Sequence, residues 1–121
     1  MDLIIPKQRF EQEIQNYFYR LGFEKIDEGY QLVREAQQQG MNYIYNNQRI
    51  QTPPKTVQIK YKVTFEGDGE ITDIDDNVER KFTQIRFESF VDDESLGILE
   101  DCMYWDEPEK VLTYIKQLFK I

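Results

Sequence analysis

Apolar and polar residues alternate strictly in the stretch TVQIKYKVTF, residues 56–65. The apolar positions are Val57, Ile59, Tyr61, Val63 and Phe65. A period of two places one row of side chains in a core and the other in water, which is typical of a strand in an antiparallel sheet. Just upstream, Pro53 and Pro54 interrupt regular structure. This stretch is therefore the clearest predicted strand of the chain.

The N-terminal part of the chain has the period of an amphipathic helix instead. Between Pro6 and Leu21 the apolar residues recur at Phe10, Ile14, Tyr17, Phe18 and Leu21. These positions form one stripe on a helix. Pro6 suits the first turn of this helix, and Gly22 suits its stop.

A second amphipathic pattern closes the chain. Asp106 is expected to cap a helix, with Glu109 reaching back three residues later. The apolar face of this helix is predicted to consist of Val111, Leu112, Ile115, Leu118 and Phe119.

Further strands are predicted around the central one. Asn46 and Asn47 tolerate the left-handed turn conformation, so residues 41–52 are expected to form a small hairpin. Downstream, Gly67, Asp68 and Gly69 are expected to form a turn, EITDI a return strand, and KFTQIRFESFV a third strand. This order predicts a three-stranded meander.

Two segments are ambiguous between helix and strand. Residues 29–39 carry Leu32, Val33 and Ala36 before a run of glutamines, which favours a short helix, although YQLVR also suits a strand. Residues 94–104 are left open, because their leucines suit a helix whereas Gly97 weakens one.

These elements predict an α+β fold: an antiparallel β-sheet of three to five strands with a central meander, packed by N-terminal and C-terminal amphipathic helices. A chain of 121 residues with 40% hydrophobic residues is expected to form a single domain, 1–121. Its one cysteine, Cys102, excludes an internal disulfide. The N-terminal MDLII is too short and too lightly basic for a signal peptide, and no apolar run suits a membrane span, so the cytoplasm is the expected location.

Most catalytic chemistry is disfavoured. The chain has no histidine, the commonest general acid–base and zinc ligand. The carboxylate-rich run from Asp73 to Glu79 resembles a calcium loop in its alternating acceptors, but Val78 stands where such a loop needs glycine, and Gln84 replaces its closing glutamate. The tripeptide at 58–60 is compatible with an element of metal-dependent nucleases, but it is better explained as part of an alternating strand. No cofactor is expected.

The net charge of −8 is unevenly distributed. Residues 1–65 carry nine basic and seven acidic groups, residues 66–109 carry three basic and sixteen acidic groups, and residues 110–121 carry three basic groups and no acidic ones. Same-face residues of a strand lie about 6.7 Å apart, which is within a Debye length of about 8 Å. The carboxylates of the middle block therefore repel one another, and we expect them to share one end or edge of the sheet.

These carboxylates suggest a binding function. We expect them to engage a basic protein, such as a nuclease or another nucleic-acid-binding enzyme, by competing with nucleic acid for its basic cleft. The predicted partner-binding residues are Asp68, Glu70, Asp73, Asp75, Asp76 and Glu79, with Asp92, Asp93 and Glu94 as a second cluster. Direct binding to nucleic acid or to a membrane is not expected. Nearby aromatic residues, Phe82, Phe90, Tyr104 and Trp105, are candidate interface anchors.

Small acidic immunity proteins and phage inhibitors of CRISPR or restriction enzymes are a functional analogy in charge and size, and no residue motif carries a family resemblance. Two alternatives stay open. One is a metal-dependent enzyme or cation-binding domain that uses the carboxylates of residues 66–79. The other is a structural subunit whose acidic face is merely solvated.

Overall fold

The computed structural model describes residues 7–72 and 79–120. Pro6, which was expected in the first helical turn, lies outside this range, as do Asp73, Asp75, Asp76 and Val78. The described elements are α1 (Lys7–Arg20), β1 (Glu24–Ile26), β2 (Gly29–Gln38), β3 (Asn42–Tyr45), β4 (Gln48–Gln51), β5 (Lys55–Thr72), β6 (Glu79–Val91), β7 (Glu94–Tyr104) and α2 (Glu109–Phe119).

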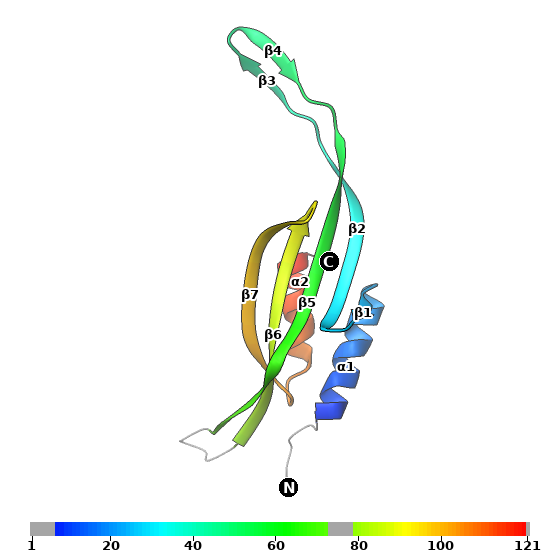
Figure 1. Cartoon of the computed structure of the whole chain (residues 1–121), viewed down its shortest axis with the longest axis vertical. Coiled ribbons are helices and arrows are strands. Elements are labelled where there is room, and N and C mark those ends of the chain that lie inside the picture. The colour runs from blue at the N-terminus through cyan, green and yellow to red at the C-terminus, as the bar shows by residue number, and fades with distance from the viewer. Residues whose placement is uncertain (1–6, 73–78, 121) are drawn as a thin grey trace.

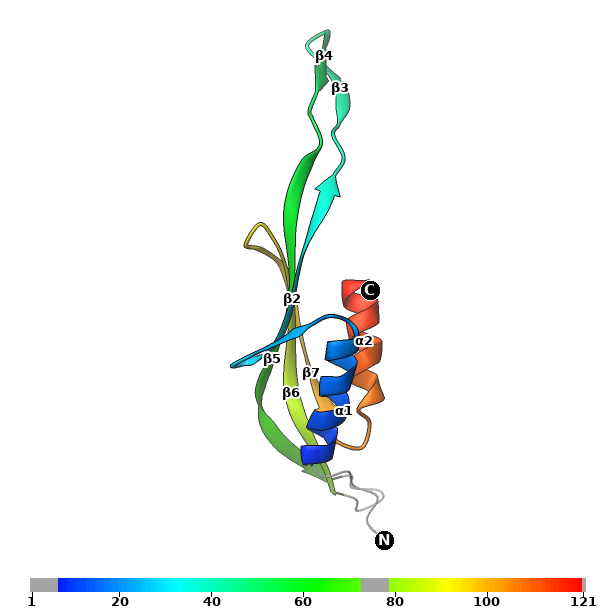
Figure 2. The ribbon, with the colours of Figure 1, turned by 90° about the vertical axis from the view of Figure 1, so that its right-hand side faces the viewer.

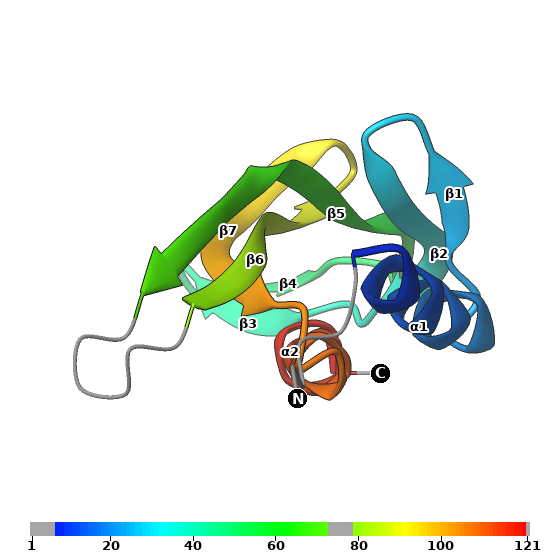
Figure 3. The same ribbon diagram turned by 90° about the horizontal axis from the view of Figure 1, so that it is seen from below.

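Five strands form one antiparallel sheet in the order β1-β2-β5-β6-β7. Both helices lie on one face of this sheet, side by side (Figures 2 and 3). The predicted α+β fold, an antiparallel sheet packed by helices from the two ends of the chain, is confirmed. A central meander is present as β5-β6-β7, and only its first two strands contain segments that the sequence assigned to a meander. Neither helix in the described part of the chain is long and apolar enough to cross a membrane.

The core lies between the helices and the sheet. Its largest fully buried side chains come from both helices and from three neighbouring strands: Phe10, Ile14, Phe18, Val63, Ile85, Phe87, Met103, Val111 and Ile115. The alternation of β5 sends Val57, Tyr61 and Val63 into this layer and leaves Lys60 and Lys62 on the opposite face. The apolar period of the sequence therefore predicted which face of β5 is covered.

Helix α1 ends as the sequence predicts. Gly22 adopts a positive φ of 92°. The amide of Gly22 donates to the carbonyl of Tyr19 at 3.1 Å, and the amide of Phe23 donates to the carbonyl of Phe18 at 2.9 Å. These two bonds form a Schellman motif, whose left-handed residue is most readily glycine.

The capping prediction for α2 is wrong. Pro108 occupies the N-cap position, in helical conformation and without a side-chain cap. The Asp106 carboxylate instead accepts a hydrogen bond from Arg80 at 2.8 Å, and Glu107 accepts a second one from the same nitrogen at 2.7 Å. Asp106 is therefore engaged by a strand that is distant in sequence, a contact that local spacing does not reveal.

The helix favoured for residues 29–39 is a strand. All ten residues of β2 pair with β5, and Tyr30 stacks on Phe18 with ring centroids 4.4 Å apart. Gly29 permits this pairing, since a Cβ there would lie 1.9 Å from the carbonyl oxygen of Val63. Residues 94–104, left open by the sequence, form strand β7. In β2, tertiary pairing overrides the helical propensity of the glutamine run.

The predicted turn at 67–69 is also wrong, and so is the return strand EITDI over residues 70–72; residues 73 and 74 lie outside the described ranges. Strand β5 continues through this segment to Thr72, with a register shift between Phe65 and Gly67, and pairs with β6. Gly69 allows a close approach: a Cβ there would lie 2.6 Å from the ring of Phe82. The two glycines thus serve a bulge and a packing contact within one long strand.

The hairpin predicted for residues 41–52 is present as β3 and β4. Asn46 and Asn47 have positive φ angles of 51° and 60°, as a two-residue hairpin turn requires. We call residues 36–56 the arm. It extends along the long axis of the molecule, away from both helices (Figures 1 and 2).

Candidate acidic binding surfaces

The expected single acidic edge is divided between two ends of the sheet. Glu70 pairs with Lys81 near one end, whereas Val91 pairs with Glu94 beside the turn at the other end. The eleven residues from Lys81 to Val91 span about 33 Å of strand. The carboxylates of the two ends therefore cannot meet one compact basic site. Asp73, Asp75 and Asp76 lie outside the described residues.

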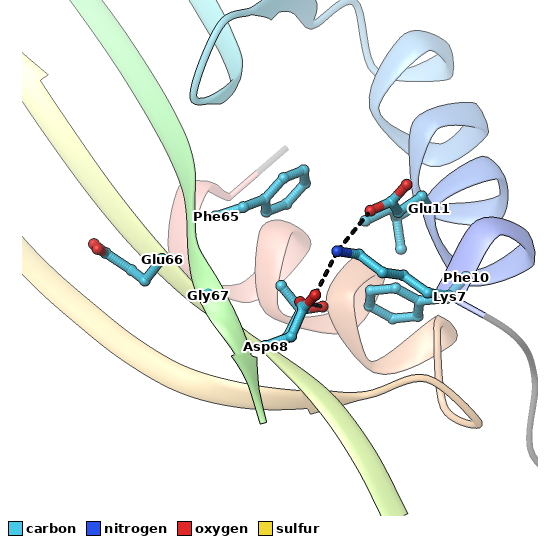
Figure 4. A pocket seen from close by; sticks show the side chains of 9 residues that line it. Lys7, Phe10, Glu11, Phe65, Glu66, Gly67 and Asp68 are labelled. Atoms are coloured by element: carbon cyan, nitrogen blue, oxygen red, sulfur yellow. Dashed lines mark hydrogen bonds and ion pairs between the residues drawn. The ribbon is translucent and has the colours of Figure 1, made fainter. Parts of the chain in front are cut away.

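Asp68 lies beneath α1, beside a pocket of about 190 Å³. Figure 4 shows the Lys7 ammonium directed at its carboxylate, with which it forms an ion pair and hydrogen bond. The hydroxyl of Thr83 donates to the same carboxylate at 2.8 Å and accepts the indole N–H of Trp105 at 3.0 Å. Burial opposes ionisation of the Asp68 carboxyl, but the hydrogen bonds from Lys7 and Thr83 and the charge of Lys7 lower its pKa overall. Asp68 therefore helps to hold the fold.

Glu70 and Glu79 lie on the two-stranded end of β5 and β6, and both are exposed. They differ from Asp68 because Asp68 pairs with Lys7. The pKa of the Glu70 carboxyl is raised, mainly by its contact with the Glu79 carboxyl and by the negative charge there, and the ammonium of Lys81 partly offsets this. Among the described residues, neither carboxylate is in an ion pair. We call residues 69–72 and 79–82 the acidic ribbon.

The second predicted cluster has a structural explanation. Asp92 and Asp93 have positive φ angles of 49° and 68°, so they form the two-residue turn between β6 and β7. The Asp92 carboxylate accepts the amide of Gln58 at 2.8 Å, and the amide of Asp92 donates to the carbonyl of Gln58 at 2.9 Å. Asp93 lies 3.6 Å from Lys60. Aspartate is favoured here because it tolerates the left-handed conformation.

The four aromatic anchor candidates are all partly buried. Phe82 packs edge-to-face against Tyr104 at 6.1 Å, and the Arg80 guanidinium lies 3.8 Å from the Tyr104 ring centroid. Lys60 covers Phe90 at 5.0 Å. Intramolecular packing is therefore their main role, although Phe82 belongs to the acidic ribbon and Tyr104 pairs with it.

No group of three or more metal-ligating side chains is present in the described ranges 7–72 and 79–120. Cys102 is a free, half-buried thiol. Its amide donates to the Asp101 carboxylate at 2.7 Å, and the other oxygen of that carboxylate accepts the hydroxyl of Tyr114 at 2.6 Å. This contact ties β7 to α2 and raises the pKa of Tyr114.

Sequence reasoning missed the exposed apolar residues. They lie in the arm, at Met41, Tyr43, Ile44 and Tyr45, and beside β7, at Leu96, Ile98, Leu99 and Leu118. The sequence placed the first four in a predicted hairpin and Leu118 on the apolar face of a predicted helix, and it left residues 94–104 open between helix and strand. Only the topology shows that β3 and β4 lie outside the main sheet and that β7 is an edge strand.

Comparison with known proteins finds no matching family model, no matching curated protein and no matching solved structure.

Proposed function

We propose that this protein is a non-catalytic, acidic protein-binding module that engages a basic partner through the acidic ribbon. The observation that carries this proposal is the contact between Glu70 and Glu79, which raises the pKa of Glu70. Two exposed carboxylates held together in this way repel each other at neutral pH. Lysine or arginine side chains of a partner would relieve the repulsion, and long-range attraction would speed association.

The partner class follows from the charge distribution. A chain with a net charge of −8 is a poor ligand for nucleic acid, whose binding needs a basic stripe. A strongly acidic chain that presents Glu70 and Glu79 on its surface instead fits the basic cleft in which an enzyme holds nucleic acid. We therefore propose a nuclease or another nucleic-acid-binding enzyme as the partner, with inhibition as the outcome of binding. A cytoplasmic location accords with the single free cysteine.

A charge-reversal comparison tests this proposal. The immobilised protein is presented with purified basic nucleases and nucleic-acid-binding enzymes at low and high salt, and binding rates and residual enzyme activity are measured. The double variant Glu70→Lys, Glu79→Lys is compared with Asp27→Lys, Glu35→Lys, which changes the net charge equally at exposed positions near the other sheet edge.

We expect the association rate constant of the acidic-ribbon variant with the partner to fall at least about tenfold. The control variant is expected to keep most of the wild-type rate. An equal loss of association rate in both variants would show that binding depends on net charge alone and not on the acidic ribbon. Absence of any salt-sensitive partner would contradict the proposal. Calorimetric titration with calcium, magnesium and manganese addresses the alternative: heat that disappears in the acidic-ribbon variant would favour a cation site.

A further inference from the structure

Exposed apolar side chains gather in two places that the proposed function does not use. Among the described residues, eight of the eleven exposed large apolar side chains lie either in the arm or beside β7. In the arm, Ile44 is 77% exposed and Tyr45 is 63% exposed. Beside β7, Leu96 is 68% exposed and Ile98 is 50% exposed. Clustered exposure of this kind marks interaction surfaces.

The residues beside β7 line a groove. It has a volume of about 270 Å³ and lies between β7 and the last turn of α2, with Leu96, Ile98, Leu99 and Leu118 on its sides. Because β7 is the last strand of the sheet, no described strand pairs with its outer edge. We call this site the β7 groove. An open edge beside apolar side chains is a template for an added strand.

The arm has complementary properties. Beyond β2 and β5 it consists only of the pair β3 and β4, and every residue of β3 is exposed. An isolated two-stranded hairpin is marginally stable in water. Figures 1 and 2 show the arm leading away from its own helices. Its large apolar side chains at Met41, Tyr43, Ile44 and Tyr45 are exposed.

Charge favours contact between these two surfaces. Residues 36–56 contain Arg49 and Lys55 and no acidic residue. The β7 groove is flanked by Glu94 and Glu100, both exposed. The chain as a whole is strongly acidic, so the arm is an exception whose charge suits the β7 groove. A second copy of this chain therefore supplies both an apolar and an electrostatic match.

We propose that the arm of one copy docks in the β7 groove of a second copy, with the apolar side chains of the arm covering those of the groove. Reciprocal docking closes a two-fold dimer, since each copy presents one arm and one groove. The acidic ribbon lies at the other end of β5 and β6 and stays available in this dimer. The proposal is therefore independent of the proposed function.

Sedimentation velocity over a range of protein concentrations tests the dimer, using the arm variant Ile44→Glu, the groove variant Ile98→Glu and the control Ile71→Glu. Ile71 is also 50% exposed but lies on the acidic ribbon. We expect wild type and control to form dimers, and each of the other variants to raise the dimer dissociation constant at least about tenfold. Circular dichroism establishes that each variant is folded.

A mixing experiment makes the test specific. An arm variant keeps its β7 groove and a groove variant keeps its arm, so one contact between them remains intact. A tagged arm variant is expected to capture the untagged groove variant and not the untagged arm variant. The charge variant Arg49→Glu provides a second arm change if Ile44→Glu does not fold. A wild type that is monomeric at all concentrations, or mixtures without selective capture, would overturn the proposal.

Discussion

The hairpins of the main sheet and the hairpin of the arm have the same antiparallel pairing but differ in what packs against them. The hairpins of the main sheet share strands, and both helices cover one of its faces, so Val63 and Ile85 are fully buried. The arm is also an antiparallel hairpin with a well-suited asparagine turn, yet nothing in the described structure covers it. Local turn chemistry is therefore enough to specify a hairpin, whereas burial against other elements determines how stable it is.

The largest contrast between the two regions is expected from truncating apolar side chains. Phe18→Ala removes a fully buried ring that contacts Phe23 and Tyr30. We expect the free energy of unfolding to fall by about 3–5 kcal/mol. In the dilute monomer, Ile44→Ala in the arm is expected to change it by less than about 0.5 kcal/mol. Urea unfolding measures both, and equal losses would mean that the arm belongs to the core.

A polar contact in the body should matter less than a core ring. Thr83 is 5% exposed and links Asp68 to Trp105 through its hydroxyl. Thr83→Val leaves the Trp105 indole N–H without this acceptor, so we expect a loss of about 1–3 kcal/mol. The exposed Thr113, whose hydroxyl bonds only to the Glu109 carbonyl in the described structure, is the matched control. Thr113→Val should stay within about 0.5 kcal/mol of wild type.

Excision of residues 39–54, the part of the arm beyond the main sheet, separates the two regions directly. Replacing residues 39–54 by Asn-Gly leaves Gln38 and Lys55, which already pair, flanking a two-residue turn. The free energy of unfolding should not fall, and it should rise by up to about 2 kcal/mol, because each halving of a flexible loop saves about 0.6 kcal/mol. Chemical unfolding of the dilute protein measures this change. A marked loss would show that the arm supports the body.

The smallest expected effect concerns the acidic ribbon. The pKa of Glu70 is raised in the folded state, so the folded protein binds this proton more tightly than the unfolded chain does. Stability from this group is present at low pH and is lost as pH rises above the ordinary glutamate range. Glu70→Gln should therefore raise the unfolding midpoint slightly at neutral pH and not at acidic pH. A higher midpoint at both pH values would point to another cause.

Local periodicity predicted the elements whose own residues carry a clear repeat or turn signal. The stripe from Phe10 to Phe18, the alternation of β5 and the Asn46–Asn47 turn were all readable, because each depends on spacing within a few residues. The strand at 29–38 was not, since its pairing with β5 overrides a glutamine-rich helical propensity. The roles of Gly67 and Gly69 depend on β6 in the same way.

The candidate site was readable only in part. Charge counting located the acidic block, but it treated Asp68, Glu70 and Asp92 alike. The fold gives them different roles: Asp68 pairs with Lys7, Asp92 extends the ladder at a turn, and Glu70 lies against another carboxylate. Whether a carboxylate is neutralised within the fold depends on contacts across strands, which composition does not encode.

The central claim is that the main sheet and its two helices are stable in a single copy, whereas the arm is stabilised by a second copy. Hydrogen exchange followed amide by amide at two protein concentrations tests this claim most directly. In dilute protein, amides of β5 at residues 57–64 should exchange orders of magnitude more slowly than those of β3 and β4. At high concentration, amides of the arm and of residues 96–99 should gain protection together, while those of the acidic ribbon do not. An arm as protected as β5 in dilute protein would contradict this account.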